Sequence, residues 1–374
     1  MNCRRTRLPG LALIALTIVI AFPFPGRADE PTGTTTTASD DFPRLEGPLR
    51  IRDLFPLSIL LMEFYPANTA HLAAGHLRLE AQLDYSNSFG MSKNVLEYLQ
   101  KRNRREPLSD SDVAAILALP GDAFYFDATV TMLNVGAQYA ICDRCQVYLN
   151  VPFLSYSGGS LDSTIEHFHS AFGLGQEGRE LVARNQLQLA VKFGNHSLAA
   201  DGSQLGSGLG DPVVGFRYAI NSSPGFDVVG EAAAKIPVGD TSRFLSTGSP
   251  DYGLQVSVQR RYARNGLYFS ASYVWLGKAD FLPNLPLGGL PAATLAYEHL
   301  FGEHWAAIGQ ASWSRSSFIR NTVEEIAAPK KEVAVGARYQ RNGKSVTLAL
   351  IENVGTFNNT PDIGIHLGTS FLLK

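Results

Sequence analysis

Residues 216–236, FRYAINSSPGFDVVGEAAAKI, hold the pattern that decides the fold. The stretch predicts two strands joined by a Ser-Ser-Pro-Gly turn, because two kinds of side chain alternate along it with a period of two. One face is apolar and consists of Phe216, Tyr218, Ile220, Val228, Ala232, Ala234 and Ile236. The other face carries Arg217, Asn221, Glu231 and Lys235. Such a hairpin places one face against an apolar environment and collects opposite charges on the other.

Twelve segments alternate in this way: 74–89, 122–141, 145–156, 208–220, 226–237, 251–263, 266–277, 290–301, 304–315, 330–341, 344–353 and 361–373. Five short turns between them alternate with six long connections: 90–121, 157–207, 238–250, 278–289, 316–329 and 354–360. Outer-membrane barrels show this alternation of short periplasmic turns and long extracellular loops. We therefore predict an all-β fold, a transmembrane antiparallel up-and-down β-barrel over residues 67–374, with about twelve strands and fourteen as the alternative count.

The polarity of the two faces also matches a membrane barrel. Trp275, Trp305 and Trp313 share the apolar faces of their strands and are expected to lie in membrane girdles. Trp305 and Trp313 are about 26 Å apart along a strand, or roughly 20 Å vertically once the strand is tilted. The expected lumen-lining residues are Arg78, Glu80, Asp84, Arg217, Glu231, Lys235, Glu298, Glu332 and Arg338. The alternative is a soluble sandwich with the apolar faces packed together.

Residues 1–28 have the form of a signal peptide, with the basic start MNCRRTRLPG, the apolar run LALIALTIVIAF and Gly26-Arg27-Ala28 as a cleavage site. We expect residues 29–66 to be a periplasmic leader whose apolar part, residues 50–66, is either a plug segment or a periplasmic tether. The predicted location is the bacterial outer membrane. With a net charge of −2 the chain lacks the basic excess of a nucleic-acid-binding protein, so no nucleic acid partner is expected.

Candidate chemistry lies in the long loops. Glu166, His167 and His169 could contact a metal or ligand or take part in catalysis, and an extended His-x-His would place both imidazoles on one side. We favour the interpretation that this loop folds inward and bonds with lumen charges, and we expect no enzyme, no metal site and no cofactor. Loop 90–121 predicts two short helices around a basic turn, acting as a lid or simply as a solvated turn.

Cys142 and Cys145 flank a tight turn of two residues. In an oxidising periplasm a disulfide between them is possible if the side chains converge. Two ligands alone do not make a metal site, and no helix of a thioredoxin-like motif follows. We therefore favour a structural staple of the turn.

Several stretches resemble a family of Gram-negative outer-membrane proteins known as a domain of unknown function: GPLRIRDLFPL (47–57), SLDSTIEHFHSAFGLGQEGRE (160–180), GLGDPVVGFRYAI (208–220), KIPVGD (235–240) and TPDIGIHLGTSF (360–371). The GLGD, IPVGD and TPDIG pieces are similar also to the porin-like group associated with aromatic-degradation operons. The resemblance implies an outer-membrane barrel, and it supplies no catalytic residue.

The sequence thus predicts a porin-like barrel for passive movement of a small solute. Because the lumen charges are of both signs, a second hypothesis is a closed barrel with a structural, adhesion or envelope-assembly role. A third, an outer-membrane enzyme that modifies lipid, has less support because no row of Ser, His and acidic residues marks the membrane rim. The expected partners are outer-membrane lipid and lipopolysaccharide, the outer-membrane assembly machinery and the solute.

Overall fold

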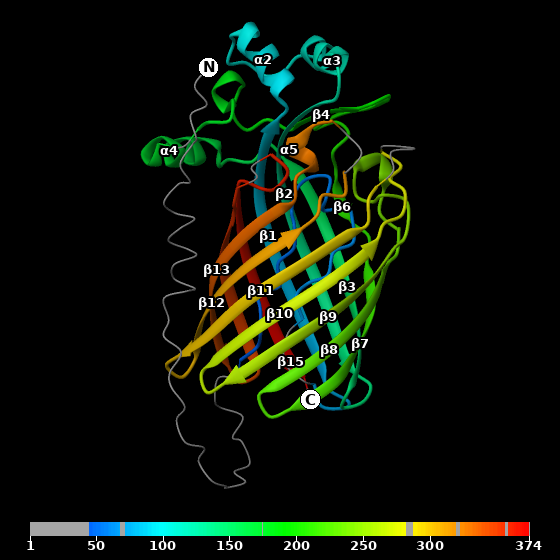
Figure 1. Ribbon diagram of the computed structural model, residues 1–374, viewed down its shortest axis with the longest axis vertical. Coiled ribbons are helices and arrows are strands. Elements are labelled where there is room, and N and C mark those ends of the chain that lie inside the picture. The colour runs from blue at the N-terminus through cyan, green and yellow to red at the C-terminus, as the bar shows by residue number, and fades with distance from the viewer. Residues whose placement is uncertain are drawn as a thin grey trace.

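The computed structural model describes residues 45–67, 72–173, 175–281, 287–318, 322–355 and 358–373. Within these residues the strands form one antiparallel sheet, and its first and last barrel strands pair with each other. The sheet therefore closes into a barrel (Figure 1). Closure pairs the backbone groups of both edges, as a sheet in lipid requires. This arrangement excludes the soluble sandwich that the alternation alone left open.

Twelve strands form the barrel wall in the described part of the chain. They are β1 (Leu77–Met91), β2 (Ala123–Ala140), β3 (Cys145–Ser157), β7 (Val213–Ser223), β8 (Phe226–Lys235), β9 (Asp251–Tyr262), β10 (Asn265–Trp275), β11 (Leu290–Phe301), β12 (Trp305–Ser314), β13 (Lys330–Arg341), β14 (Lys344–Asn353) and β15 (Ile363–Leu373). Each wall strand pairs with its two neighbours in the sequence order of the wall. The predicted barrel and its strand count are confirmed.

Two strand predictions need correction. The segment 208–220 is interrupted, so that β6 (Ser207–Leu209) and β7 pair separately with β3. Pro212 lies in the interruption, and a proline has no amide hydrogen for the strand ladder. The loop 157–207 also contains a hairpin of two strands, β4 (Gln188–Phe193) and β5 (His196–Asp201). Strand β4 of this hairpin pairs with the first residues of β2, from Ala123 to Asp127. The hairpin has its own period of two, with Leu189, Val191 and Phe193 on one face and the turn Gly194-Asn195 between its strands, and pairing with β2 adds tertiary contact.

The long connections gather at one end of the barrel and the short turns at the other (Figure 1). We call these the loop end and the turn end. The loop end carries the helices α2 (Lys93–Arg102), α3 (Asp110–Ala118), α4 (Asp162–Phe172) and α5 (Glu324–Ala327), and the short 3-10 turns η1 (Arg179–Leu181) and η2 (Thr241–Arg243). Helices α2 and α3 confirm the two predicted in the first long loop. No helix in the described ranges is long and apolar enough to cross a membrane.

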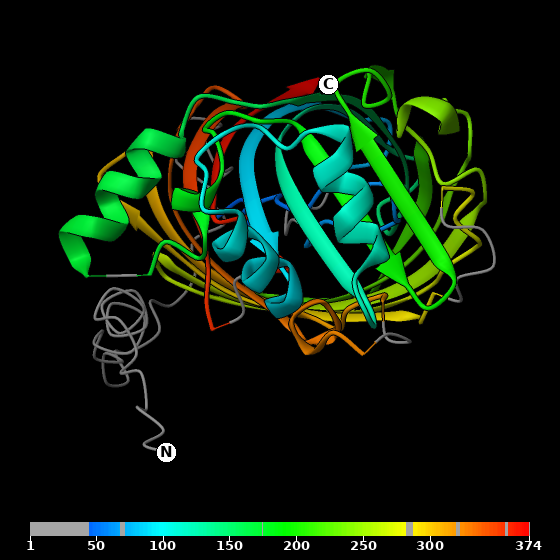
Figure 2. The same ribbon diagram turned by 90° about the horizontal axis from the view of Figure 1, so that it is seen from above.

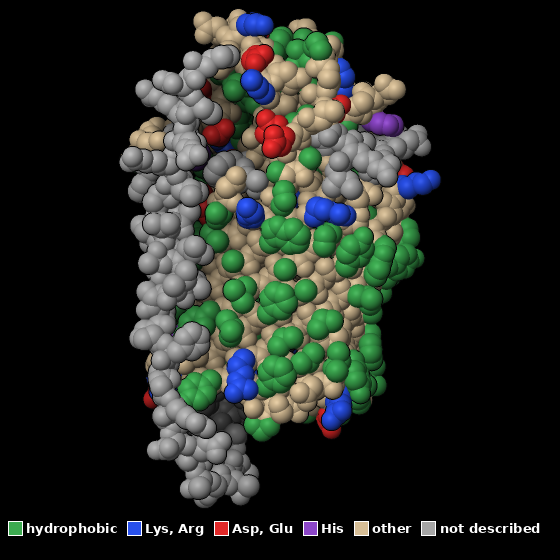
Figure 3. All heavy atoms as spheres, in the orientation of Figure 1, with side chains coloured by type: hydrophobic (Ala, Val, Ile, Leu, Met, Phe, Trp, Pro, Cys, Tyr) green, Lys and Arg blue, Asp and Glu red, His purple; other side chains and the backbone are tan. Residues whose placement is uncertain are grey.

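The two faces of the wall differ in chemistry. Outward side chains such as Phe269, Leu295 and Leu350 are exposed, and Figure 3 shows hydrophobic side chains spread over the wall between the charged groups of the two ends. Inward positions carry polar residues such as Gln82, Asn134 and Gln310, all buried within the barrel. Because the inside is polar and the outside apolar, the wall has the pattern of an outer-membrane barrel.

Residues 45–67 lie inside the barrel rather than along its wall. We call them the inner segment. Most of its side chains are buried, and those of Leu49, Leu57 and Met62 have no exposed area. Backbone hydrogen bonds from Ser58 and Ile59 to the carbonyl of Phe55 turn the chain within the lumen. Figure 2 shows the segment inside the ring of strands. The signal peptide predicted over residues 1–28 and the leader residues 29–44 lie outside the described residues.

Candidate functional site

The inner segment enters the lumen near the turn end, where two wall strands hold its backbone. The amide of Gly47 donates to Oε2 of Glu298 over 2.9 Å, and Nη1 of Arg338 donates to the carbonyl of Gly47 over 3.0 Å. Glu298 and Arg338 also bond with each other, at 2.8 Å. Further along, Nε of Arg50 lies 2.7 Å from Oε2 of Glu80. These buried pairs are charge-assisted and anchor the start of the segment.

Near the loop end, two lysines of the wall hold the middle of the segment. Nζ of Lys330 pairs with the Asp53 carboxylate and donates to the hydroxyl of Ser58. Nζ of Lys235 donates to the carbonyl of Leu60 over 2.8 Å. The amide of Met62 donates to Oδ2 of Asp251 over 2.9 Å. The segment is therefore fastened at both ends of the lumen.

Residues 52–63, which we call the tip, also bond among themselves. Nη2 of Arg52 donates to the carbonyls of Ile59, over 3.1 Å, and Leu61, over 2.5 Å. The amide of Asp53 donates to Oε2 of Glu63 over 2.9 Å. The tip thus keeps much of its backbone hydrogen bonding independent of the wall, so it can retain its shape if it moves.

Apolar packing seats the tip below the loops. Leu54, Phe55, Leu57, Ile59 and Leu60 belong to one buried cluster with side chains of β2, β3, β4 and the loops. The ring of Phe55 meets that of Phe126 edge to face, with centroids 5.0 Å apart, an arrangement that aromatic pairs prefer. Glycine in the wall gives the segment room: a Cβ at Gly253 would lie 2.6 Å from Cε2 of Phe64.

The structure places the predicted lumen charges on the inside of the wall. Eight of the nine are buried and the ninth, Glu332, is half-buried. Arg217 pairs with Glu231 at 3.0 Å, and Asp84 contacts Nδ1 of His366 at 2.7 Å. These charges therefore pair across neighbouring strands or, for Glu298 and Arg338, across one intervening strand, and the inner segment takes part in this network.

Sequence reasoning missed several members of the network, among them Arg50, Asp53, Asp211, Asp251, Lys330 and His366. Lys330, Asp251 and His366 could have been found, because each lies on the polar face of a predicted strand. Asp53 lies outside the predicted strands, and Asp211 lies at the interruption between β6 and β7. The period of two therefore gives no signal for either residue.

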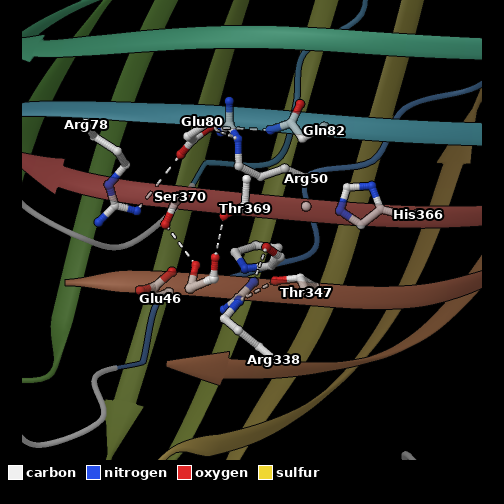
Figure 4. Close-up of a pocket in the computed structure, with 13 residues that line it drawn as sticks. Glu46, Arg50, Arg78, Glu80, Gln82, Arg338, Thr347, His366, Thr369 and Ser370 are labelled. Atoms are coloured by element: carbon white, nitrogen blue, oxygen red, sulfur yellow. Dashed lines mark hydrogen bonds and ion pairs between the residues drawn. The ribbon is translucent and has the colours of Figure 1, made fainter. Parts of the chain in front are cut away.

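Two small cavities lie beside the inner segment. One cavity of about 40 Å³ lies near the turn end, between β1, β13, β14, β15 and the inner segment (Figure 4). A second, of about 20 Å³, is lined by Arg52, Glu63 and Tyr65 of the inner segment and by Arg217 and Glu231 of the wall. Such volumes hold one or a few water molecules. The inner segment contributes side chains to both cavities and fills part of the lumen.

The three loop candidates do not form a common site. They lie on α4, so the expectation of an extended His-x-His is wrong: residues two apart on a helix point in different directions. The carboxylate of Glu166 pairs with Arg105 and Arg184, while Nδ1 of His169 contacts the carbonyl of Gly175 at 2.8 Å. Hydrogen bonding from Arg184, helped by Arg105, lowers the pKa of Glu166. Glu166 bonds with loop arginines rather than with lumen charges.

The structure also locates the remaining predicted residues. Cys142 and Cys145 are free thiols at a turn between β2 and β3. The backbone amide of each residue donates to the backbone carbonyl of the other. A disulfide between them stays a prediction. Trp275, Trp305 and Trp313 point outward with about half of each side chain exposed. Trp305 lies near the turn end, and the other two lie near the loop end. Among the described residues no group of three or more His, Cys, Asp or Glu could hold a metal ion.

Comparisons with known proteins were made on sequence and on structure. A model of the family described as "Protein of unknown function (DUF3187)" matches residues 64–373. No match was found among curated proteins. The crystal structure of an outer membrane channel from Pseudomonas putida F1 is 12% identical, with a TM-score of 0.49, and the alignment covers 83% of this chain and 100% of that one. The NanC porin is 9% identical, with a TM-score of 0.41, and the alignment covers 78% of this chain and 98% of that one.

Proposed function

The chain belongs to the DUF3187 family of proteins of unknown function, and from that premise we propose that it is an outer-membrane channel for a small solute, closed by its inner segment. In this proposal the lumen is the path, the loop end faces the exterior and the turn end faces the periplasm. The apolar outer face contacts lipid and lipopolysaccharide. The proposal assigns no chemical reaction to the protein.

One observation carries the proposal: the obstruction in the lumen is separate from the wall. The inner segment precedes β1 and takes no part in the strand ladder of the described residues. Its contacts with the wall are apolar side-chain packing, ion pairs, and hydrogen bonds between side chain and backbone, such as those of Lys330, Lys235 and Arg338. Withdrawal would therefore break no strand pairing, and it would leave a lumen lined by amides, hydroxyls and paired charges.

A second candidate function rests on the same charge network. Because the inner segment completes buried ion pairs at both ends of the lumen, it can also serve as permanent filling for a barrel with a structural role. Breaking a buried pair costs about 3–5 kcal/mol, since one charge is left without its partner. The two candidates differ in one respect: only a channel needs the segment to move.

Conductance in planar bilayers separates the two. We would compare the mature chain, a variant that lacks residues 45–66, and a variant in which residues 92–119 are replaced by a short Gly-Ser turn. The last removes α2 and α3 and keeps the inner segment, so it controls for any general damage to the loop end. We expect rare openings in the wild type and in the loop variant, and steady conductance without the inner segment.

A folded deletion variant that conducts no current would contradict the channel and favour the structural barrel. Folding would be checked by far-ultraviolet circular dichroism and by the shift in gel mobility that a closed barrel shows before and after heating. Steady conductance in the loop variant alone would instead make α2 and α3 the obstruction.

A further inference from the structure

The larger cavity in the lumen is rich in hydrogen-bond donors. Arg78 and Glu80 from β1, Arg338 from β13 and Arg50 from the inner segment line it, with Glu46 also at its edge (Figure 4). Four residues with hydroxyl groups also line it, together with Gln82 and His366: Ser345, Thr347, Thr369 and Ser370. The cavity lies near the turn end, because Arg78 is the second residue of β1 and lies opposite Leu372 of β15.

The three arginines differ in how many of their hydrogen-bond donors have acceptors in the protein. Arg338 donates to Thr347 and Glu298 and to the carbonyls of Gly47 and Pro48. Arg78 is 6% exposed, and its Nη1 lies 4.0 Å from Oε1 of Glu80, which is too long for a hydrogen bond.

Arg50 is also incompletely satisfied. Its Nε lies 2.7 Å from Oε2 of Glu80, within ion-pair distance, but neither Nε nor Nη1 has a hydrogen-bond acceptor among the described residues. A buried guanidinium donor without an acceptor is costly, so such a group points to a bound water or ion.

The acidic groups at the cavity leave these donors available. Glu80 already accepts from Gln82 over 3.4 Å as well as pairing with Arg50, so its oxygens are shared among several donors. Glu46 contributes its backbone amide to Glu298, which places its main chain at the edge of the cavity. Arg50 and Arg78 therefore flank one carboxylate, and Nη1 of Arg50 has no hydrogen-bond acceptor among the described residues.

We propose that this cavity binds a small oxyanion between Arg50 and Arg78. Guanidinium groups match the geometry of sulfate, phosphate and carboxylate oxygens, because two parallel N–H groups can reach two oxygens of one anion. The hydroxyls of the wall supply further donors at the same cavity. A volume of about 40 Å³ suits a small ion rather than a larger organic molecule.

Because of where the two arginines lie, a bound anion would affect the position of the inner segment. This inference rests on the proposed channel. Arg78 belongs to the wall and Arg50 to the inner segment, so the anion touches both parts. A ligand shifts an equilibrium toward the state that it binds more tightly. Withdrawal of the segment removes Arg50 from the site, so the anion binds the closed arrangement more tightly and holds the segment in place.

Thermal unfolding of the refolded mature chain in detergent tests the site. The probe is sodium sulfate, compared with sodium chloride at equal ionic strength. We expect sulfate to raise the midpoint of unfolding of the wild type, and Arg78→Gln and Arg50→Gln each to weaken sulfate binding about tenfold or more, because each removes a charge-assisted hydrogen bond. The control is Arg261→Gln: Arg261 pairs with Asp227 at 2.6 Å and does not line the cavity.

An unchanged response to sulfate in Arg78→Gln, or no response in the wild type, would overturn the anion site. Conductance then tests the consequence: sulfate should make openings rarer in the wild type and should leave Arg50→Gln unaffected. Since unfolding reports binding without any need for current, the site and the channel can fail separately. Sulfate-dependent stability in a barrel that never conducts would support the anion site and contradict the channel.

Discussion

At the scale of single residues, Glu166 links α4 to two other parts of the loop end. Its carboxylate pairs with Arg105, which precedes α3, and with Arg184, which follows η1. Both arginines are about 40–45% exposed, so solvent screens the pairs and the expected contribution is about 1 kcal/mol. In Glu166→Gln we expect amide hydrogen exchange over residues 162–173 to be about fivefold faster at pH 7.

The lowered pKa of Glu166 determines how the stabilising contribution of its ion pairs changes with pH. The contribution of the pairs is complete above the ordinary carboxyl pKa of 4.5 and is lost as the pH falls through the lowered value in the folded protein. The difference between Glu166→Gln and the wild type should therefore shrink below about pH 4. Equal exchange of the two proteins at pH 7 would show that these pairs do not hold α4.

At the scale of elements, the inner segment depends on Lys330 at the start of β13. Lys330 points into the barrel toward Asp53 and Ser58, whereas its neighbour Lys331 points outward and is exposed. In Lys330→Gln the Asp53 carboxylate loses a buried partner, at a cost of about 3–5 kcal/mol to the closed arrangement. We expect channel openings at least about tenfold more frequent than in the wild type.

Lys331→Gln is the matched control for this variant, since it removes the same charge from the adjacent position on the other face of β13. Openings in planar bilayers should be as rare in Lys331→Gln as in the wild type. Equal opening rates in the two variants would mean that the Lys330 pair does not hold the tip.

At the scale of the whole molecule, the three tryptophans report how the barrel sits in a membrane. The chain contains three tryptophans in total, all in strands and all facing outward. Trp305 stacks near Phe301, with centroids 6.5 Å apart, and Trp275 meets Tyr273 at 5.0 Å, as in aromatic belts. In lipid vesicles, bromine placed high on the acyl chains should quench their fluorescence more strongly than bromine near the chain ends. Quenching no stronger than that of a soluble protein would contradict a membrane-spanning barrel.

Much of the wall could be predicted from local patterns. Strands β11, β13 and β14 begin and end where the alternation does, because a side-chain period of two follows from the geometry of each strand alone. The inward direction of Arg217, Glu231 and Lys235 follows from the same parity. The interruption at Gly210–Pro212 carries a local signal, because Pro212 has no amide hydrogen for the strand ladder, and the hairpin of β4 and β5 carries a period of two around the turn Gly194-Asn195. Local patterns do not show that this hairpin pairs with β2 or that β6 pairs with β3.

The sequence by itself therefore determined the wall strands, the polarity of their two faces and the inward charges, because each rests on neighbours a few residues apart in one chain. Closure of the barrel pairs β1 with β15, from opposite ends of the wall, and belongs to the tertiary structure. Only the tertiary structure decided what fills the lumen. Residues 50–66 read equally well as a plug segment or as a tether, since their apolar side chains say nothing of which surface covers them. The pairing of Asp53 with Lys330, or of Gly47 with Glu298, joins residues more than 240 positions apart. Such contacts form only once the wall has closed around the segment and brought those charges to the same place.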